Sequence, residues 1–115
     1  MDALNRKVKV FRAQDGRRPF LDWLNSLRDR RAKQKIQVRL DRLSLGNLGD
    51  HRSVGEGVTE LRLDYGPGYR IYVGQDGSSI VILLVGGDKS SQDGDIKTAK
   101  GFWKEYQAEK SRGSR

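Results

Sequence analysis

Hydrophobic and polar residues recur with two different periods along the chain, and each period predicts a different kind of element. Strict alternation in Lys7–Phe11 indicates a first strand. Apolar residues at helical spacing then predict a helix that begins near Pro19, followed by a second from about Arg30 to Ser44. Because so few residues separate the two helices, we expect them to form a helical hairpin.

The period changes to two after Gly55, and the turn sequences GPG and DG separate the segments that follow. Three strands are predicted, at residues 58–65, 69–75 and 79–85. The last is apolar on both faces, which is typical of a central strand, and it is expected to end at two glycines that deliver Asp88 and Lys89 into a loop. Helical spacing returns from about Gln92 to Glu109.

The element order β-α-α-β-β-β-α predicts an α+β fold. We expect a mainly antiparallel, curved sheet that packs on the N-terminal helical hairpin and on the C-terminal helix. The 115 residues fit a single domain, assigned to residues 1–110, and the tail at 111–115 is expected to be disordered.

The composition argues against disulfide bonds, metal sites and membrane spans. The chain has no cysteine and one histidine, so neither a disulfide framework nor a structural zinc site is expected, and no metal or other cofactor is predicted. No stretch approaches the roughly 18 apolar residues of a membrane span, and the N-terminus lacks a signal-peptide core. We therefore expect a cytoplasmic protein that does not bind membranes.

The net charge of +8 is the first indication of function, and it is unevenly distributed. Residues 1–57 carry a net charge of +7 and residues 58–115 a net charge of +1. Seven Lys and Arg residues lie in the segment 28–42 alone, where they form either a solvated helix face or a surface that contacts phosphates. Basic proteins of this size bind polyanions, nucleic acid above all, although a basic surface also serves solubility.

Strand alternation gathers polar side chains on one face of the sheet. Glu60, Arg62 and Asp64 share a face of their strand, and Arg70 and Tyr72 share a face of the next. If GPG is a three-residue loop, Asp64 lies opposite Arg70 and Arg62 opposite Tyr72. Lys89 is expected at the rim of this face. The group forms either a set of cross-strand ion pairs or a solvent-facing phosphate site.

A phosphate site of this kind suits RNA cleavage. Arginine binds phosphate oxygens with two hydrogen bonds, lysine adds a point charge, and such cations stabilise the charge that develops in the transition state. RNA carries its own nucleophile, the 2′-hydroxyl, so the reaction requires no metal-bound water. Glu60 and Tyr72 are the side chains that this geometry offers for proton transfer.

Two segments, GEGVTELRLDYGPGYRIYV and VILLVGGDKSSQDGDIKTAK, resemble the RelE/HigB-like toxins of type II toxin–antitoxin modules, in the branch of addiction-module killer proteins. The resemblance extends from about Phe11 to the last helix. It implies a RelE-like fold and an mRNA endonuclease, an mRNA interferase that cleaves ribosome-bound message by metal-independent 2′-hydroxyl attack.

The resemblance also implies roles for particular residues. It places phosphate and transition-state contacts on Arg62, Arg70 and Lys89, with Glu60, Ser91 and Gln92 as supporting polar groups. Together with the strand geometry this gives the catalytic candidates Arg62, Arg70, Lys89 and Glu60. The substrate-binding candidates are Tyr72, Ser91, Gln92 and Arg52. Several members of the wider superfamily use a histidine or tyrosine near the C-terminus as acid or base, and this chain has no histidine there.

The expected partners are messenger RNA, the ribosome and a cognate antitoxin, in this branch usually a helix-turn-helix protein through which the toxin meets DNA only indirectly. Two alternatives remain open. A ParE-type toxin shares the fold and poisons gyrase without cleaving anything, and a non-catalytic relative binds only its antitoxin or nucleic acid. Fold alone does not separate these functions.

Overall fold

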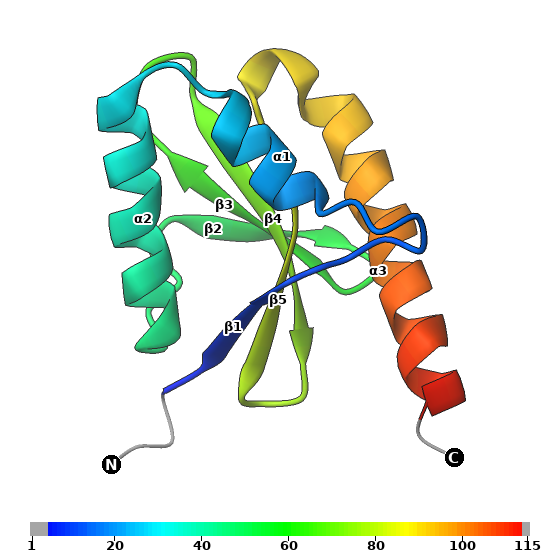
Figure 1. Ribbon diagram of the computed structural model, residues 1–115. Helices are drawn as coiled ribbons and strands as arrows, with labels where there is room; N and C mark the ends of the chain where they lie inside the picture. The colour runs from blue at the N-terminus through cyan, green and yellow to red at the C-terminus, as the bar shows by residue number, and fades with distance from the viewer. Residues whose placement is uncertain (1–4, 114–115) are drawn as a thin grey trace.

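A computed structural model describes residues 5–113 and shows an α+β fold built on a five-stranded mixed sheet (Figure 1). Its strands are β1 (Lys7–Val10), β2 (His51–Gly55), β3 (Val58–Leu63), β4 (Tyr69–Asp76) and β5 (Ile80–Asp88). Its helices are α1 (Pro19–Ser26), α2 (Arg30–Ser44) and the long C-terminal α3 (Gln92–Gly113), which the short 3₁₀ turn η1 (Lys89–Ser91) precedes.

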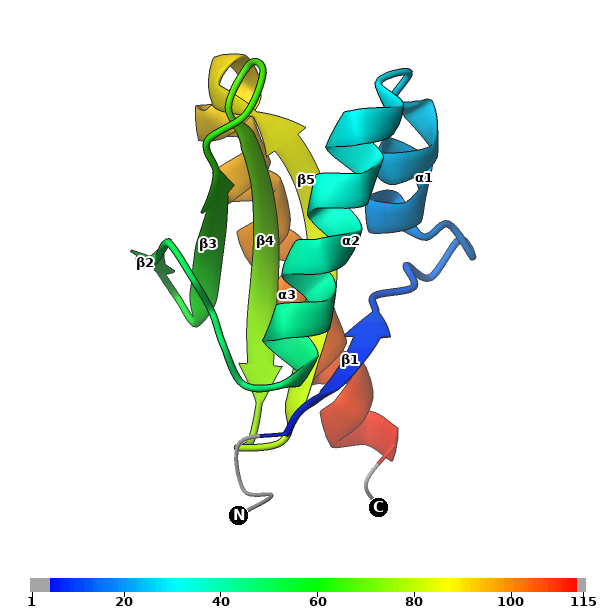
Figure 2. The ribbon, with the colours of Figure 1, turned by 90° about the vertical axis from the view of Figure 1, so that its left-hand side faces the viewer.

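The strand order across the sheet is β1-β5-β4-β3-β2. β1 pairs with β5 in parallel, whereas β5, β4, β3 and β2 form an antiparallel series. The strand of highest apolar content, β5, lies between β1 and β4, as a run that is hydrophobic on both faces requires. Figure 2 shows β2 at the free edge of the sheet, away from α1.

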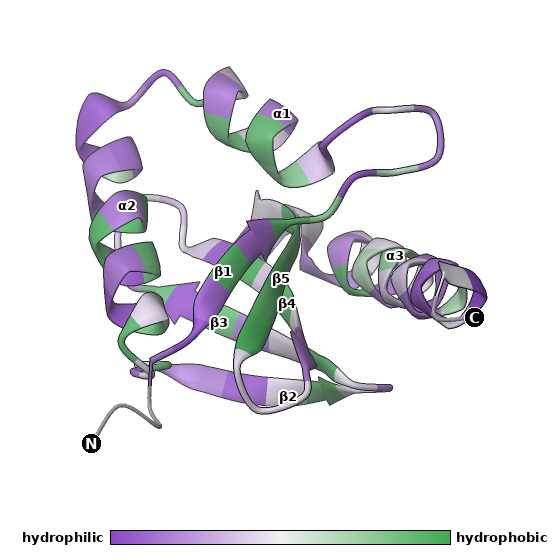
Figure 3. Ribbon diagram, turned by 60° about the horizontal axis from the view of Figure 1, so that its bottom comes forward, coloured by the Kyte–Doolittle hydropathy of each residue, from purple (hydrophilic) through white to green (hydrophobic). Residues whose placement is uncertain are grey.

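Helices cover both faces of the sheet. On one face α1 and α2 enclose a core to which Phe20, Ile36 and Leu43 contribute from the helices. On the other face α3 packs Ala99 and Trp103 against β4 and β5. Figure 3 shows the green, hydrophobic stretches of the central strands between α2 and α3. Each of the three helices therefore contributes one apolar side to a two-sided core.

Three expectations about element bounds need correction. His51–Gly55 forms the edge strand β2, which the pattern of alternation did not predict. Strand β5 does not end at its glycines but continues through them to Asp88, and Lys89 begins a 3₁₀ turn rather than an open loop. Residues 111–113 belong to α3 and are not a disordered tail; residues 114–115 lie outside the described part.

Side chains on both faces of the sheet explain why positions 86 and 87 of β5 are glycines. A Cβ on Gly86 would overlap the ring of Trp23 from α1, and a Cβ on Gly87 would overlap the carboxylate of Asp95 from α3. The two glycines therefore let the helices approach the strand closely on both faces. Within residues 5–113, no helix has the length and apolar content needed to cross a membrane.

Candidate functional site

Arg62 on β3 and Arg70 on β4 lie directly opposite each other in the antiparallel ladder. The expected register was wrong by two residues, because the connection between the strands spans 64–68 rather than GPG alone. A shift of two keeps every side chain on its face, so the polar face itself was predicted correctly. The shift replaces the expected Asp64–Arg70 pair with two like charges, and such a pair destabilises a sheet unless an anion compensates it.

A cleft beside this arginine pair brings the three predicted cations together. We call it the loop cleft: its lining includes Asp50, Arg62, Asp64, Arg70 and Lys89, with the 66–68 turn at one side, and its volume is about 490 Å³. Lys89 reaches it from η1, and its Cβ lies close to Gly68. The structure thus places two guanidinium groups and an ammonium group around one opening.

Each of the two arginines donates one hydrogen bond from its guanidinium group within residues 5–113, which leaves the other Nη atom of each without a hydrogen-bond acceptor there. Arg70 donates from one Nη to the carbonyl oxygen of Gly68 at 3.0 Å, and Arg62 pairs with Asp50 at 2.9 Å. The Nε atoms of both arginines are buried and have no hydrogen-bond partner in the described chain. Buried donors of this kind are costly unless something accepts from them.

Glu60 is fully buried beneath the arginine pair, so the expectation that it faces solvent was wrong. Its carboxylate accepts hydrogen bonds from Arg52 at 2.9 Å, from Tyr72 at 3.0 Å and from Gln92 at 2.8 Å. The Nε atom of Arg70 lies 3.9 Å from it. Burial alone would raise the pKa of Glu60, but the hydrogen bonds outweigh it and hold that pKa below its ordinary value.

Tyr72 is fully buried as well, which corrects its placement in an open groove. Burial, and the hydrogen bond that its hydroxyl donates to Glu60, raise the pKa of Tyr72 far above the usual tyrosine value. Both proton-transfer candidates are therefore engaged with each other under the sheet surface, where strand alternation alone had placed them in solvent. The reason is that α3 packs on this face of the sheet.

The remaining candidates surround Glu60 or lie on the approach to α3. Arg52 is exposed on β2 and reaches inward to Glu60, as Gln92 does from the first residue of α3. Ser91 is exposed, but its hydroxyl donates to Asp95 at 2.5 Å within the turn that begins α3. These side chains organise the ends of the elements around the cleft and do not line it.

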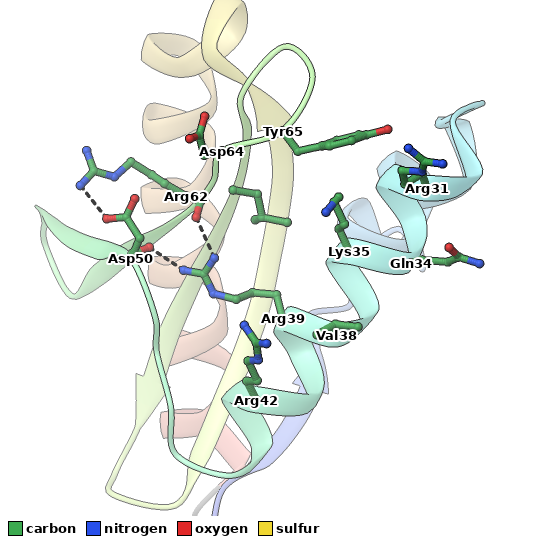
Figure 4. Close-up of a pocket in the computed structure, with 11 residues that line it drawn as sticks. Arg31, Gln34, Lys35, Val38, Arg39, Arg42, Asp50, Arg62, Asp64 and Tyr65 are labelled. Atoms are coloured by element: carbon green, nitrogen blue, oxygen red, sulfur yellow. Dashed lines mark hydrogen bonds and ion pairs between the residues drawn. The ribbon is translucent and has the colours of Figure 1, made fainter.

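A second depression, which adjoins the loop cleft, lies between α2 and β3; we call it the helix groove (Figure 4). Its volume is about 550 Å³, and its basic lining residues are Arg31, Lys35, Arg39, Arg42 and Arg62. Asp50, Arg62, Leu63 and Asp64 line both depressions. Part of the basic cluster in segment 28–42 therefore lines a surface groove, in which Arg31, Lys35 and Arg42 remain exposed.

Sequence reasoning missed the role of Asp50, which follows a glycine-containing loop with no periodicity. It also missed that Tyr65 crosses to α2, where its hydroxyl donates to Asp29 at 2.9 Å. Tyr106, the C-terminal tyrosine, donates to Asp76 at 2.6 Å at the far end of β4, about 20 Å from Arg70 by strand rise. Among residues 5–113 no three His, Cys, Asp or Glu side chains are grouped closely enough to hold a metal ion.

Comparison with known proteins gives one informative relative. A protein of Haemophilus influenzae, described as uncharacterized, is 54% identical to this chain over 81 residues, which cover 70% of this chain and 82% of that protein. No family model and no solved structure matches the chain. Identity this high over most of both proteins shows common descent and a shared fold. The chain belongs to the same family as this uncharacterized Haemophilus influenzae protein.

Proposed function

We propose that the protein is the toxin of a toxin–antitoxin module and acts as an endoribonuclease on messenger RNA, with a RelE-like topology. The observation that carries the proposal is the convergence of Arg62, Arg70 and Lys89 on the loop cleft. The resemblance of the ELR, GPGYR and GGDKSSQ segments to RelE/HigB-like toxins supports it. Both lines of support concern the same residues.

The charge arrangement favours an anionic ligand in the loop cleft. Arg62 and Arg70 face each other across the ladder; Arg62 pairs with Asp50 at 2.9 Å, and Arg70 has a longer ion pair with the buried Glu60 at 3.9 Å. A phosphate between the two guanidinium groups would accept from the Nη atoms of Arg62 and Arg70 that donate to nothing else within residues 5–113, and Lys89 would add a third positive charge. A phosphodiester therefore meets the electrostatic requirement of the cleft better than a neutral ligand does.

Cleavage then proceeds by attack of the 2′-oxygen on the adjacent phosphorus. The bond to the 5′-oxygen of the next nucleotide breaks, and the products are a 2′,3′-cyclic phosphate and a 5′-hydroxyl. The two arginines stabilise the charge on the phosphate oxygens in the transition state. Asp64, an exposed carboxylate on the cleft, is the group we assign to accept the 2′-hydroxyl proton, and Lys89 the group that supplies one to the leaving oxygen.

Glu60 takes a different role in this proposal from the one expected of it. Because its carboxylate is buried and already accepts three hydrogen bonds, it does not reach a bound RNA. We assign it a positioning role, in which it holds Arg70, Arg52 and Gln92 in place.

The partner in the cell is an antitoxin, in this branch a helix-turn-helix protein, which a chain of net charge +8 would bind through an acidic segment.

Brief induction in cells followed by primer extension on abundant messages tests the proposal. Wild-type protein should cut ribosome-bound message at defined positions, and Arg70→Ala should reduce cutting by at least about 100-fold, since it removes transition-state charge stabilisation. Arg70→Lys, which keeps the charge but loses the two-pronged geometry, should retain an intermediate rate.

The matched control is Arg30→Ala, which removes the same charge from an exposed position of α2 outside both depressions. This variant should cut like wild type. Intact message together with DNA breaks would replace the proposal with a gyrase-binding toxin. Cutting that survives Arg62→Ala, Arg70→Ala and Lys89→Ala would remove the loop cleft as the active site.

A further inference from the structure

The helix groove contains cations of two kinds. Arg39 reaches across the groove from α2 and donates to the carbonyl oxygens of Leu48 at 2.9 Å and of Arg62 at 2.7 Å (Figure 4). It also donates to the carbonyl oxygen of Asp50. Burial lowers the pKa of Arg39 despite the nearby Asp50 carboxylate. Arg39 is thus a structural brace that holds the segment 48–50 and β3 against α2.

The other cations of the groove are available to a ligand. Arg31 and Arg42 have no ion pair or side-chain hydrogen bond within residues 5–113, and the Nζ atom of Lys35 lies over the ring of Tyr65, 5.1 Å from its centroid. All three line the groove from α2. Cations without a carboxylate partner among residues 5–113, gathered along one groove, match a phosphate backbone.

Flat and apolar surfaces lie among these charges. Figure 4 shows Tyr65 extending from the β3–β4 connection toward α2, above Lys35. The ring packs against the hydrophobic core, and its hydroxyl donates to Asp29, the N-cap residue of α2, at the end of the groove. Val38 is 48% exposed, a high value for a branched apolar side chain, and it lines the groove together with Leu63. Aromatic rings and guanidinium planes between cations are what unstacked nucleobases bind.

Arg62 connects this groove to the loop cleft, because it lines both. We propose that the helix groove is a nucleotide subsite: it holds the nucleotide that adjoins the phosphate bound by Arg62 and Arg70, with the base against Tyr65. This inference rests on the proposed function and adds the path of the substrate. An RNA strand is favoured over an acidic peptide because the groove continues into the phosphate site and offers stacking surfaces as well as charge.

Binding of an uncleavable RNA tests the subsite without depending on catalysis. The probe is a fluorescein-labelled tetranucleotide of 2′-O-methyl RNA, which lacks the nucleophile, and its Kd is measured by fluorescence anisotropy. Tyr65→Ala should weaken binding about 5- to 100-fold, the range for loss of one stacked base. Tyr65→Phe, which keeps the ring and loses only the hydroxyl, should bind within about threefold of wild type.

Charge is tested with a matched pair of double variants. Arg31→Ala/Arg42→Ala should weaken binding at least about 5-fold more than Arg28→Ala/Arg30→Ala, which loses the same charge at exposed positions outside the groove. Equal affinities of these two double variants, together with wild-type binding by Tyr65→Ala, would overturn the subsite.

The outcomes separate the two proposals. If Arg70→Ala loses binding while the groove variants keep it, the phosphate site stands and the subsite falls. If Arg70→Ala and the groove variants all bind like wild type, both the phosphate site and the subsite are wrong.

A labelled hexaglutamate peptide serves as a second probe. If it binds as tightly as the RNA and shows the same dependence on Arg31, Arg42 and Tyr65, the groove receives an acidic protein segment and the nucleotide assignment is wrong.

Discussion

Glu60 is the residue on which the geometry of the loop cleft depends most directly. One buried carboxylate accepts from Arg52 on β2, Tyr72 on β4 and Gln92 on α3, and it lies 3.9 Å from the Nε of Arg70. Four elements therefore meet at a single side chain. A buried charge that is satisfied in this way stabilises the native arrangement, and its loss leaves several donors without acceptors.

Replacing Glu60 should therefore cost stability. We expect Glu60→Ala to lower the free energy of unfolding by roughly 3 kcal/mol, because the buried Tyr72 hydroxyl and the Gln92 amide lose their acceptor. Glu60→Gln, which keeps the volume and one acceptor oxygen, should lower it by less. Urea unfolding followed by circular dichroism measures both values. A loss below about 1 kcal/mol for Glu60→Ala would show that the hydrogen bonds to the buried carboxylate do not stabilise the fold.

The same carboxylate predicts a pH dependence. Its folded-state pKa lies below the ordinary value, so ionised Glu60 stabilises the fold fully above the unfolded-state pKa of about 4.3. That contribution is lost as pH falls through the lowered folded-state pKa. The stability difference between wild type and Glu60→Gln should therefore be constant from about pH 6 to 8 and should shrink in acid. A difference that grows on acidification would contradict the assignment.

At the residue scale, the sequence predicted which side chains share a face but not which of them remain accessible. Period two separates Glu60 and Tyr72 from Leu61 and Ile71 whatever the register, and this separation is confirmed. Exposure depends on whether a helix packs on that face, and the helix that does, α3, begins some 30 residues later in the chain. No pattern within the strands contains that information.

Among the elements, strand β5 shows how the rest of the fold overrides a local signal. Two consecutive glycines predict a break, yet the backbone stays in the sheet because Gly86 and Gly87 pair with Ile71 and Arg70 of β4. Glycine is required at both positions because Trp23 and Asp95 occupy the space that side chains would need. Strand β2 was missed because its own sequence does not predict a strand. Its sequence, HRSVG, is polar and short, and its pairing with β3 rather than its own pattern makes it a strand.

Glycine substitutions test the importance of these close approaches. Gly86→Ala should lower the free energy of unfolding by about 1–3 kcal/mol or more, because its Cβ would overlap the Trp23 ring. Gly101→Ala in α3 is the matched control, since nothing lies within 4 Å of the added Cβ. It should raise the free energy of unfolding by about 0.5–1 kcal/mol through helix propensity. Thermal unfolding of both variants measures these changes. If both substitutions changed the free energy of unfolding in the same direction, the prediction would be wrong.

Over the whole molecule, part of the excess positive charge lies along one surface groove. The excess of cations in residues 1–57 includes Arg31, Lys35 and Arg42, which line the helix groove, and this groove adjoins the loop cleft. The sequence predicted that the charge would meet a polyanion and left open whether the 28–42 cluster was merely solvated. The structure shows a division: some of these cations line a groove, and Arg28 and Arg30 face solvent.

Salt dependence should report how many phosphates the molecule neutralises. For single-stranded RNA, the slope of log K against log salt changes by about 0.7 for each phosphate that a variant no longer neutralises. Arg70→Ala and Arg42→Ala should each make the slope shallower by about that amount, whereas Arg30→Ala should leave it unchanged. Titrations of the tetranucleotide from low to moderate salt give these slopes. A common slope for all three variants would show that the positive charge acts only as a diffuse field.

The chain contains two tryptophans, and each is seated over a glycine on an opposite side of the sheet: Trp23 of α1 over Gly86, and Trp103 of α3 over Gly74. Each helical layer therefore carries its own optical reporter. Single Trp→Phe variants would make the intrinsic fluorescence of this small protein specific for one layer. Denaturation of each variant, followed by the fluorescence of its one remaining tryptophan, would then show whether the layer of α1 and α2 unfolds together with α3 or before it.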